Sequence, residues 1–208
     1  FRFLLNVDFF MTTVLCDKFI NNSKKVYLNH HIYDSPVVNV EKEQKICEKF
    51  SSYDVIFLPS QNLIKLFKEM FARYNNSSKI KIPILKEIGY PKFDFLEKKI
   101  KKNVKGQINN ILISPTGIYG YPDFTMIYNL KDLIDELICK TDFNIIFRPH
   151  PLNRHDPNIL QINKFFETNA KFHYDTSEDY SSVYSKSMCL LTDQSDTAYM
   201  FAFLTMRP

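Results

Sequence analysis

Short apolar runs alternate along the second half of the chain with longer segments in which apolar residues recur at helical spacing. The short runs predict strands within "NNILISPTG", "NIIFRPH", "KFHYD" and "SMCLLTD". The longer segments predict helices within "MIYNLKDLIDELICK", "NILQINKFFET" and "TAYMFAFL". Strands that alternate with helices pair in parallel through right-handed crossovers. The pattern therefore predicts an α/β unit built on a doubly wound parallel sheet.

The first half of the chain shows the same alternation. Residues 54–60, "DVIFLPS", predict a buried strand, and the segment after it repeats apolar residues at helical spacing. A second strand is predicted at 82–88, where Gly89 and Pro91 stop it. A further strand is predicted in "KKVYLNHH", followed by a loop and by a helix over about 38–50.

The two series predict two Rossmann-like lobes that face a cleft, residues 1–103 and residues 104–208, each with a parallel sheet. The lysine-rich segment "EKKIKKNVK", Glu97 to Lys105, separates them and is interpreted as a solvated linker or helix face. The alternative is a surface that associates with an anionic membrane. Because the chain begins at Phe1 and stops at "FLTMRP", we expect the first lobe to be incomplete at its start and the second at its end.

Composition narrows the class of protein. The 208 residues are 45% hydrophobic, which suffices for one large core or two small ones. Basic and acidic residues nearly balance, 27 against 23, so no nucleic-acid partner is expected. The four cysteines form no CxxC pair, which favours reduced thiols in the cytoplasm over a zinc site or a disulfide framework. No apolar run is long enough to cross a bilayer.

Polar residues follow every predicted strand of the second lobe, where the ligands of open α/β sheets bind. The arginine and histidine that end "NIIFRPH" predict an anion site, and the polar groups before the last helix would either cap it or hold a phosphate. Any one of these residues is more often a cap or a turn former, but their coincidence on successive strand ends favours a ligand site. Neither the dinucleotide-binding glycine pattern nor a P-loop occurs. The candidates are Ser114, Thr116, Arg148, His150, Asp175 to Ser177, Asp193, Ser195, Asp196 and Thr197.

Six segments together resemble the CDP-glycerol glycerophosphotransferase-like family: "HHIYDSP", "DVIFLPS", "IGYPKFD", "ILISPTG", "IIFRPHP" and "CLLTDQSDTAYMFAFLTMRP". The resemblance implies the GT-B fold and a role in teichoic acid or capsule synthesis. It implies that a nucleotide-activated donor binds the second lobe, with Arg148 and the turn 193–197 at its diphosphate. It also implies catalytic histidines at His150 and His30. Because this chain has His30-His31 where the family has His-Gly, His31 is a second candidate.

The expected reaction moves a glycerophosphate, a polyol phosphate or a sugar from the donor to a polysaccharide or lipid-linked acceptor. His30 or His31 would be the general base, since a neutral histidine suits proton removal near pH 7. Arg148 and the amino end of the last helix would stabilise the diphosphate charge without a metal ion or another cofactor. The alternatives are a UDP-sugar glycosyltransferase or epimerase of the same fold and a non-catalytic nucleotide-binding module. We expect a cytoplasmic protein with peripheral association at the inner face of the membrane.

Overall fold

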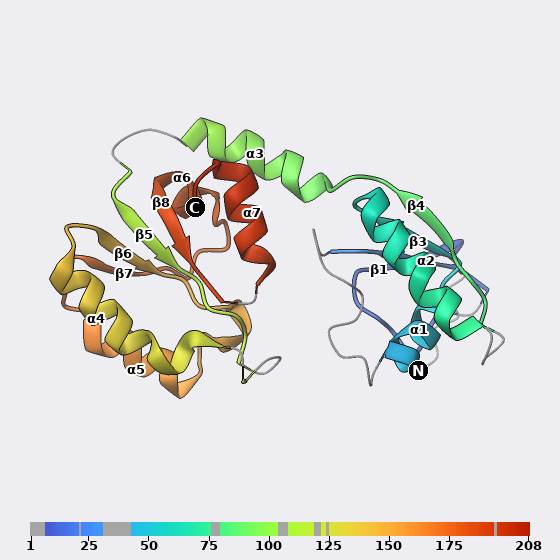
Figure 1. Ribbon diagram of the computed structural model, residues 1–208, viewed down its shortest axis with the longest axis horizontal. Coiled ribbons are helices and arrows are strands. Elements are labelled where there is room, and N and C mark those ends of the chain that lie inside the picture. Colours follow the sequence, from blue (N-terminus) through green and yellow to red (C-terminus); the bar gives the residue numbers. More distant parts are fainter. Residues whose placement is uncertain are drawn as a thin grey trace. The chain divides into compact units, whose positions relative to one another are not determined.

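The computed structural model describes residues 7–20, 22–30, 43–75, 80–103, 108–118, 122–123, 125–193 and 195–208. The chain divides into two compact units, Phe1–Pro91 and Lys92–Pro208, and each is described by itself (Figure 1). Helix α3 (Pro91–Asn103) begins at this division and lies almost entirely in the second unit. The sequence pattern instead places residues up to 103 in the first lobe, so the two divisions differ by about the length of this helix.

The first unit contains a four-stranded parallel sheet in the order β1-β2-β3-β4. The strand predicted at 54–60, the helix after it and the strand at 82–88 are confirmed, and α1 confirms the later part of the helix predicted over 38–50. Strand β1 is missing from the sequence-based prediction; unlike β3, it buries none of its side chains fully, so its sequence lacks the signal of a core strand. The elements are β1 (Phe9–Thr12), β2 (Lys24–Leu28), α1 (Glu43–Ser51), β3 (Val55–Leu58), α2 (Gln61–Asn75) and β4 (Ile84–Glu87).

Helices α1 and α2 pack on one face of this first sheet. Ile56 and Leu58 alternate along β3, and both are fully buried in the cluster that the two helices complete. Phe50 of α1 and Phe67 of α2 meet edge to face in that cluster, with ring centroids 4.9 Å apart. Burying each such side chain contributes roughly 1.5–3 kcal/mol to folding. The apolar periodicity of the two helices thus fixes the layer that covers the sheet.

The second unit contains a second four-stranded parallel sheet, in the order β7-β6-β5-β8. This arrangement confirms the predicted α/β class with parallel sheets. Two short 3-10 helices, η2 (Met126–Asn129) and η3 (Pro151–Asn153), lie in the connections after β5 and β6. The strands are β5 (Asn110–Ile113), β6 (Asn144–Phe147), β7 (Phe172–Tyr174) and β8 (Ser187–Leu191). The α-helices after α3 are α4 (Leu130–Lys140), α5 (Pro157–Phe166), α6 (Ser181–Lys186) and α7 (Asp196–Thr205).

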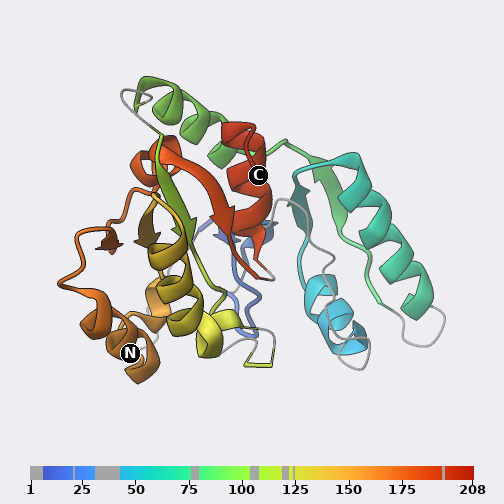
Figure 2. The same cartoon turned by 60° about the vertical axis from the view of Figure 1, so that its left-hand side comes forward.

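The pleat of the strands divides the second core between two layers of helices. Ile113 of β5 and Phe147 of β6 are register partners, and both are buried in a cluster with Ile134 of α4. Leu112 and Ile146, the preceding pair in register, point to the opposite face because successive side chains alternate. Figures 1 and 2 show α4 and α5 on one face of this sheet and α6 and α7 on the other. Both faces are therefore covered, as a doubly wound sheet requires.

Helix α3 is attached to the second unit at the loop before α6. Lys99 Nζ lies 2.8 Å from a carboxylate oxygen of Asp179, and Lys92 Nζ lies 5.5 Å from the centre of the Tyr180 ring. Up to residue 103, the lysine-rich segment is therefore part of a helix, and its association with an anionic membrane stays a prediction. Within the described ranges, no helix combines the length and the apolar character needed to cross a membrane.

Candidate functional site

The polar segments predicted to form a site lie along one edge of the second sheet, here called the carboxyl edge. Ser114 follows β5 directly, Arg148 follows β6, Asp175 follows β7 and Asp193 comes two residues after β8. Because the four strands are parallel, their carboxyl ends meet at the same edge. The predicted juxtaposition of these strand ends is confirmed.

The Asp193 carboxylate connects two backbone segments by hydrogen bonds. Its Oδ1 accepts a hydrogen bond from the Thr116 amide at 2.7 Å, and its Oδ2 accepts one from the Met126 amide at 2.8 Å. The hydroxyl of Thr125 closes the same junction by donating to the Thr116 carbonyl at 3.3 Å. Asp193 therefore joins the loop 114–118 after β5 to the start of η2, with one carboxylate oxygen on each. Its contact with a donor diphosphate stays a prediction.

The backbone of Ser114 is held from the neighbouring strand. The Ser114 amide donates to the Leu191 carbonyl at 3.0 Å, and the Thr192 hydroxyl donates to the Ser114 carbonyl at 2.6 Å. These bonds extend the β5–β8 pairing into the loop 114–118. They fix the backbone that carries the Ser114 and Thr116 hydroxyls, which remain predicted donor contacts.

Ser195 caps helix α7, as one of the two sequence interpretations holds. Its hydroxyl accepts a hydrogen bond from the Thr197 amide at 3.2 Å and lies 2.9 Å from the Thr197 hydroxyl. Asp196 is the first residue of the helix, where the negative charge of a carboxylate interacts favourably with the positive end of the helix dipole. Capping accounts for this polar turn, and the phosphate contacts of Ser195, Asp196 and Thr197 stay predictions.

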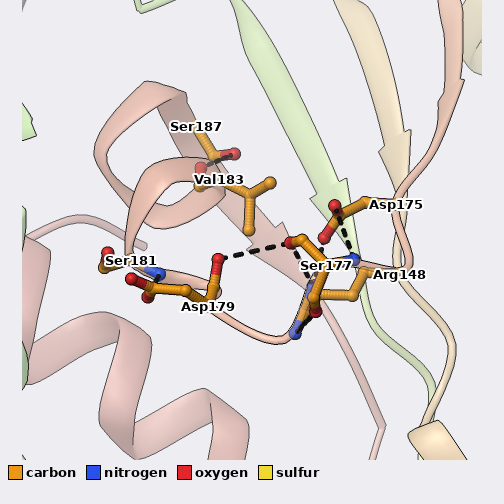
Figure 3. A network of polar contacts seen from close by, with 7 residues as sticks. All are labelled: Arg148, Asp175, Ser177, Asp179, Ser181, Val183 and Ser187. Atoms are coloured by element: carbon orange, nitrogen blue, oxygen red, sulfur yellow. Dashed lines mark hydrogen bonds and ion pairs between the residues drawn. The ribbon is translucent and has the colours of Figure 1, made fainter.

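Arg148 and Asp175 form an ion pair between the ends of β6 and β7 (Figure 3). The Arg148 guanidinium also donates to the Ser177 carbonyl at 2.8 Å and to the Ser177 hydroxyl at 3.2 Å. Only 11% of the Arg148 side chain and 7% of the Asp175 side chain are exposed. The charge of Arg148 is thus neutralised within the protein, where it holds the loop after β7. Its contact with a diphosphate stays a prediction.

The same network continues toward the start of α6 (Figure 3). The Ser177 hydroxyl donates to the Asp179 carbonyl at 3.2 Å, and the Asp179 carboxylate accepts a hydrogen bond from the Ser181 amide at 3.0 Å. The bond from Lys99, followed by those from Ser181, lowers the pKa of Asp179 to about 2. The segment 175–181 is therefore an ordered loop that links Arg148 to helix α3.

His150 lies at the exposed end of β6 and caps η3. Its Nδ1 accepts a hydrogen bond from the Leu152 amide at 3.3 Å. The protein atoms around the ring exclude part of its water, and this desolvation, together with the positive charge of Arg154, lowers the pKa of His150 below its ordinary value. A neutral imidazole whose Nδ1 is an acceptor carries its proton on Nε2. His150 can therefore offer an Nε2–H donor to a ligand.

Asn153 is a buried residue of the carboxyl edge that the sequence pattern does not single out. It is 1% exposed, and its Oδ1 accepts a hydrogen bond from the Ile118 amide at 3.2 Å. A Cβ at Gly117 would lie 3.1 Å from Asn153 Oδ1 and 3.6 Å from the His150 ring. Glycine at 117 thus allows the loop after β5 to pack against η3. In the sequence, only its place in the proline-containing turn "HPLN" connects Asn153 with His150. Such a turn does not indicate that the asparagine is buried.

His30 lies at the carboxyl end of β2 in the first unit, as predicted, and is exposed. Its carbonyl accepts a hydrogen bond from the Tyr90 hydroxyl at 2.7 Å, and the Asn29 amide before it donates to the Phe57 carbonyl at 3.0 Å. The backbone at this strand end is therefore held from both β3 and the segment after β4. His31 lies outside the described residues, and the pairing of either histidine with His150 stays a prediction.

No group of three or more His, Cys, Asp and Glu side chains is placed to hold a metal ion in the part of the chain that the structure describes. The cysteines form no disulfide among those residues. The metal-independent reaction inferred from the sequence stays a prediction.

Two parallel α/β units, the second with a polar carboxyl edge, place the protein in the GT-B class of folds. The chain belongs to the CDP-Glycerol:Poly(glycerophosphate) glycerophosphotransferase family, whose model matches residues 18–208. The resemblance seen in the sequence is thereby confirmed. Among curated proteins, none shows a significant similarity to the chain.

Two solved structures of the wall teichoic acid polymerase TagF share the fold. The first has a TM-score of 0.52 and 20% sequence identity, over 90% of this chain and 48% of the polymerase chain. The second, a histidine-to-alanine variant, has a TM-score of 0.55 and 18% identity, over 97% of this chain and 53% of its own. The chain thus spans about half the length of the solved chains it matches.

Proposed function

We propose that the chain belongs to a transferase that takes a CDP-activated donor such as CDP-glycerol and passes its glycerophosphate, or a related polyol phosphate or sugar, to a cell-surface polymer. Membership of the glycerophosphotransferase family over residues 18–208 is the observation that carries the proposal. The polar carboxyl edge of the second sheet supports it, since α/β sheets bind ligands there. The fold shared with a wall teichoic acid polymerase agrees with a polymer acceptor.

In a glycerophosphate transfer, the acceptor hydroxyl attacks the phosphorus that bears the glycerol. The bond from that phosphorus to the bridging oxygen breaks, and CMP leaves with the electron pair. Charge grows on the phosphate oxygens, so hydrogen-bond donors at the carboxyl edge stabilise the transition state. His150 suits this role because its lowered pKa keeps it neutral near pH 7 and its Nδ1 is already engaged by the Leu152 amide, which leaves Nε2–H for a phosphate oxygen.

The acceptor hydroxyl loses its proton to a histidine of the first unit, His30 or His31. Two observations support His30: it is exposed at the end of β2, and the Tyr90 hydroxyl holds its backbone carbonyl. The reaction needs no metal ion in this proposal, because N–H donors carry the electrostatic stabilisation. The protein works in the cytoplasm at the inner face of the membrane, where the lysines of α3 meet anionic lipid and a lipid-linked or polysaccharide acceptor is at hand.

Donor binding and transfer test the proposal separately. Isothermal titration of the 208-residue chain with CDP-glycerol, CDP, UDP and UDP-glucose measures donor preference, and labelled CDP-glycerol with a glycerophosphate-primed acceptor measures transfer. We expect preference for the cytidine ligands and incorporation of label into polymer. Preference for UDP-glucose would replace the proposal by a sugar transferase or epimerase. If the chain, extended to the length of its relatives, binds the cytidine ligands but transfers no label, the proposed transferase would be replaced by a non-catalytic binding module.

A further inference from the structure

The turn after β6 contains buried hydrogen-bond donors without acceptors. Asn153 Nδ2 and Arg154 Nε are both buried, and neither has a hydrogen-bond partner among the described residues. A buried donor left unpaired loses its hydrogen bonds to water without replacement, so proteins seldom leave two of them on consecutive residues. An acceptor from outside the chain would remove this cost.

The orientation of the Asn153 amide is fixed by its other end. Because Oδ1 accepts the Ile118 amide hydrogen at 3.2 Å, the opposite atom must be the NH2 group, which can only donate. Gly117 packs against this side chain and the His150 ring without a Cβ to push them away. The donor of Asn153 is therefore held by the same contacts that join the loop 114–118 to η3.

Arg154 adds a positive charge that pairs with no carboxylate of the described residues. It has no ion-pair partner in the described part of the chain, whereas Arg148 is paired with Asp175. Asp156, two residues further on, forms no ion pair with Arg154 within the described ranges; its Oδ1 accepts hydrogen bonds from the Asn158 amide at 2.9 Å and from Asn158 Nδ2 at 3.1 Å. The charge of Arg154 is close enough to His150 and Tyr174 to influence both titrations.

The backbone of Arg154 is anchored at the carboxyl edge. Its carbonyl accepts a hydrogen bond from the Tyr174 hydroxyl at 3.4 Å, and Tyr174 is the last residue of β7. The Asn153 amide donates to the His150 carbonyl at 2.8 Å, which keeps the turn closed. A buried water would satisfy the two free donors but would leave the charge of Arg154 unbalanced. An anion satisfies both requirements.

We propose that Asn153 and Arg154 form an oxyanion subsite beside His150, that it takes a phosphate oxygen of the donor diphosphate, and that Arg154 rather than Arg148 supplies the cation there. The identity of the ligand rests on the proposed function; the subsite itself rests on the unpaired donors and the unbalanced charge. A diphosphate fits because it offers several acceptor oxygens and enough negative charge to meet a guanidinium and two N–H donors together.

Titration calorimetry with inorganic pyrophosphate and with CDP tests the subsite in the 208-residue chain. We expect Arg154→Gln to weaken the binding of both ligands about 10- to 100-fold, because a charge-assisted hydrogen bond is lost. Arg154→Lys keeps the charge but lacks the Nε–H, so its loss should be smaller. Asn153→Asp keeps the acceptor for the Ile118 amide and replaces the donor by a second oxygen, so it should bind pyrophosphate worse than the parent. His155→Ala, at the exposed next position, is the matched control and should bind as the parent does.

The outcomes separate the subsite from the proposed function. Parent-like affinity of Arg154→Gln for both ligands, with a native circular dichroism spectrum, would overturn the subsite while leaving the transferase in place. Arg154-dependent binding of pyrophosphate without preference for CDP over UDP would support the subsite and overturn the CDP-activated donor. A parent chain that binds neither ligand would overturn both. Should Arg154→Gln fail to fold, equal affinity of Arg154→Lys and the parent would still count against the Nε–H contact.

Discussion

The guanidinium of Arg148 and the carboxylate of Asp175 pair across the carboxyl ends of β6 and β7, and both side chains are largely buried. The pair gathers Ser177 and orders the loop that leads to α6. Six residues later in the sequence, Arg154 has no ion-pair partner among the described residues. Arg148, the cation of the "RPH" segment, thus holds a loop of the fold. We infer that Arg154 is the cation that contacts the ligand.

Arg148→Ala should destabilise the second unit. Removing one partner of a buried ion pair leaves Asp175 with an uncompensated charge, so we expect the free energy of unfolding to fall by about 3 kcal/mol. Chemical denaturation followed by circular dichroism measures the change. The double variant Arg148→Met with Asp175→Leu should recover part of the loss, because no buried charge remains. An unfolding midpoint equal to the parent's would show that the pair contributes nothing.

Asp193→Ala should release the loop 114–118 and the start of η2. Two charge-assisted hydrogen bonds are lost, and each is worth roughly 1.5–3 kcal/mol. Hydrogen exchange reports the effect locally: the Thr116 and Met126 amides should exchange faster by at least tenfold, while amides in β6 change less. Asp193→Asn keeps one acceptor oxygen and should protect one of the two amides. Unchanged exchange at both amides would contradict the bracing role.

Arg154→Gln should raise the pKa of His150. The positive charge of Arg154 adds to desolvation in lowering this pKa, so removing the charge makes protonation of the imidazole easier. The pH titration of the His150 ring signals by NMR measures the shift. Lys171→Gln removes the same charge at the opposite edge of the sheet, where Lys171 Nζ bonds the Thr141 carbonyl at 2.7 Å, and should leave the His150 titration unchanged. A pKa of His150 that falls in Arg154→Gln would refute the assigned coupling.

Lys99→Ala should cost a small, pH-dependent stability. Asp179 titrates in the folded protein at about 2, below its ordinary 3.8, so its pairing stabilises the fold above pH 3.8 and the benefit is lost as the pH falls through 2. Because the two side chains are 40% and 50% exposed, screening limits the effect to about 0.5 kcal/mol at neutral pH. Denaturation of parent and variant at pH 7 and pH 2 should show the difference at the higher pH alone. Lys98→Ala, on the same helix, should show no such pH dependence.

Loss of the general base should lower turnover with little change in donor affinity. In the proposed transferase, His30→Ala or His31→Ala should reduce the transfer rate by about a hundredfold or more, since general-base catalysis contributes that much. Transfer of label from CDP-glycerol and calorimetry with CDP measure the two quantities on the same samples. His155→Ala serves as the histidine control. Parent-like turnover in both variants would leave the mechanism without its base.

The sequence by itself determined the two α/β units with parallel sheets, apart from strand β1, and the edge of the second sheet at which polar residues gather. These features depend on hydrophobic periodicity and on the order of strands and helices, which are local properties of the chain. The cap of α7 is local too, because Ser195 and the Thr197 amide that it binds are two residues apart. The motifs "RPHP" and "TDQSD" also sufficed to indicate the family that the comparison confirms.

Only the tertiary structure decided what the side chains at that edge contact. Arg148 meets Asp175 from 27 residues away, and Asp193 meets the Thr116 amide from 77 residues away, so neither partner follows from a local pattern. Asn153 is buried because the loop after β5 passes over it at Gly117, a contact that exists only once β5 and β6 pair. The sequence lists the charges and the hydrogen-bonding groups, but long-range packing decides which of them find partners within the fold, as Arg148 does at Asp175.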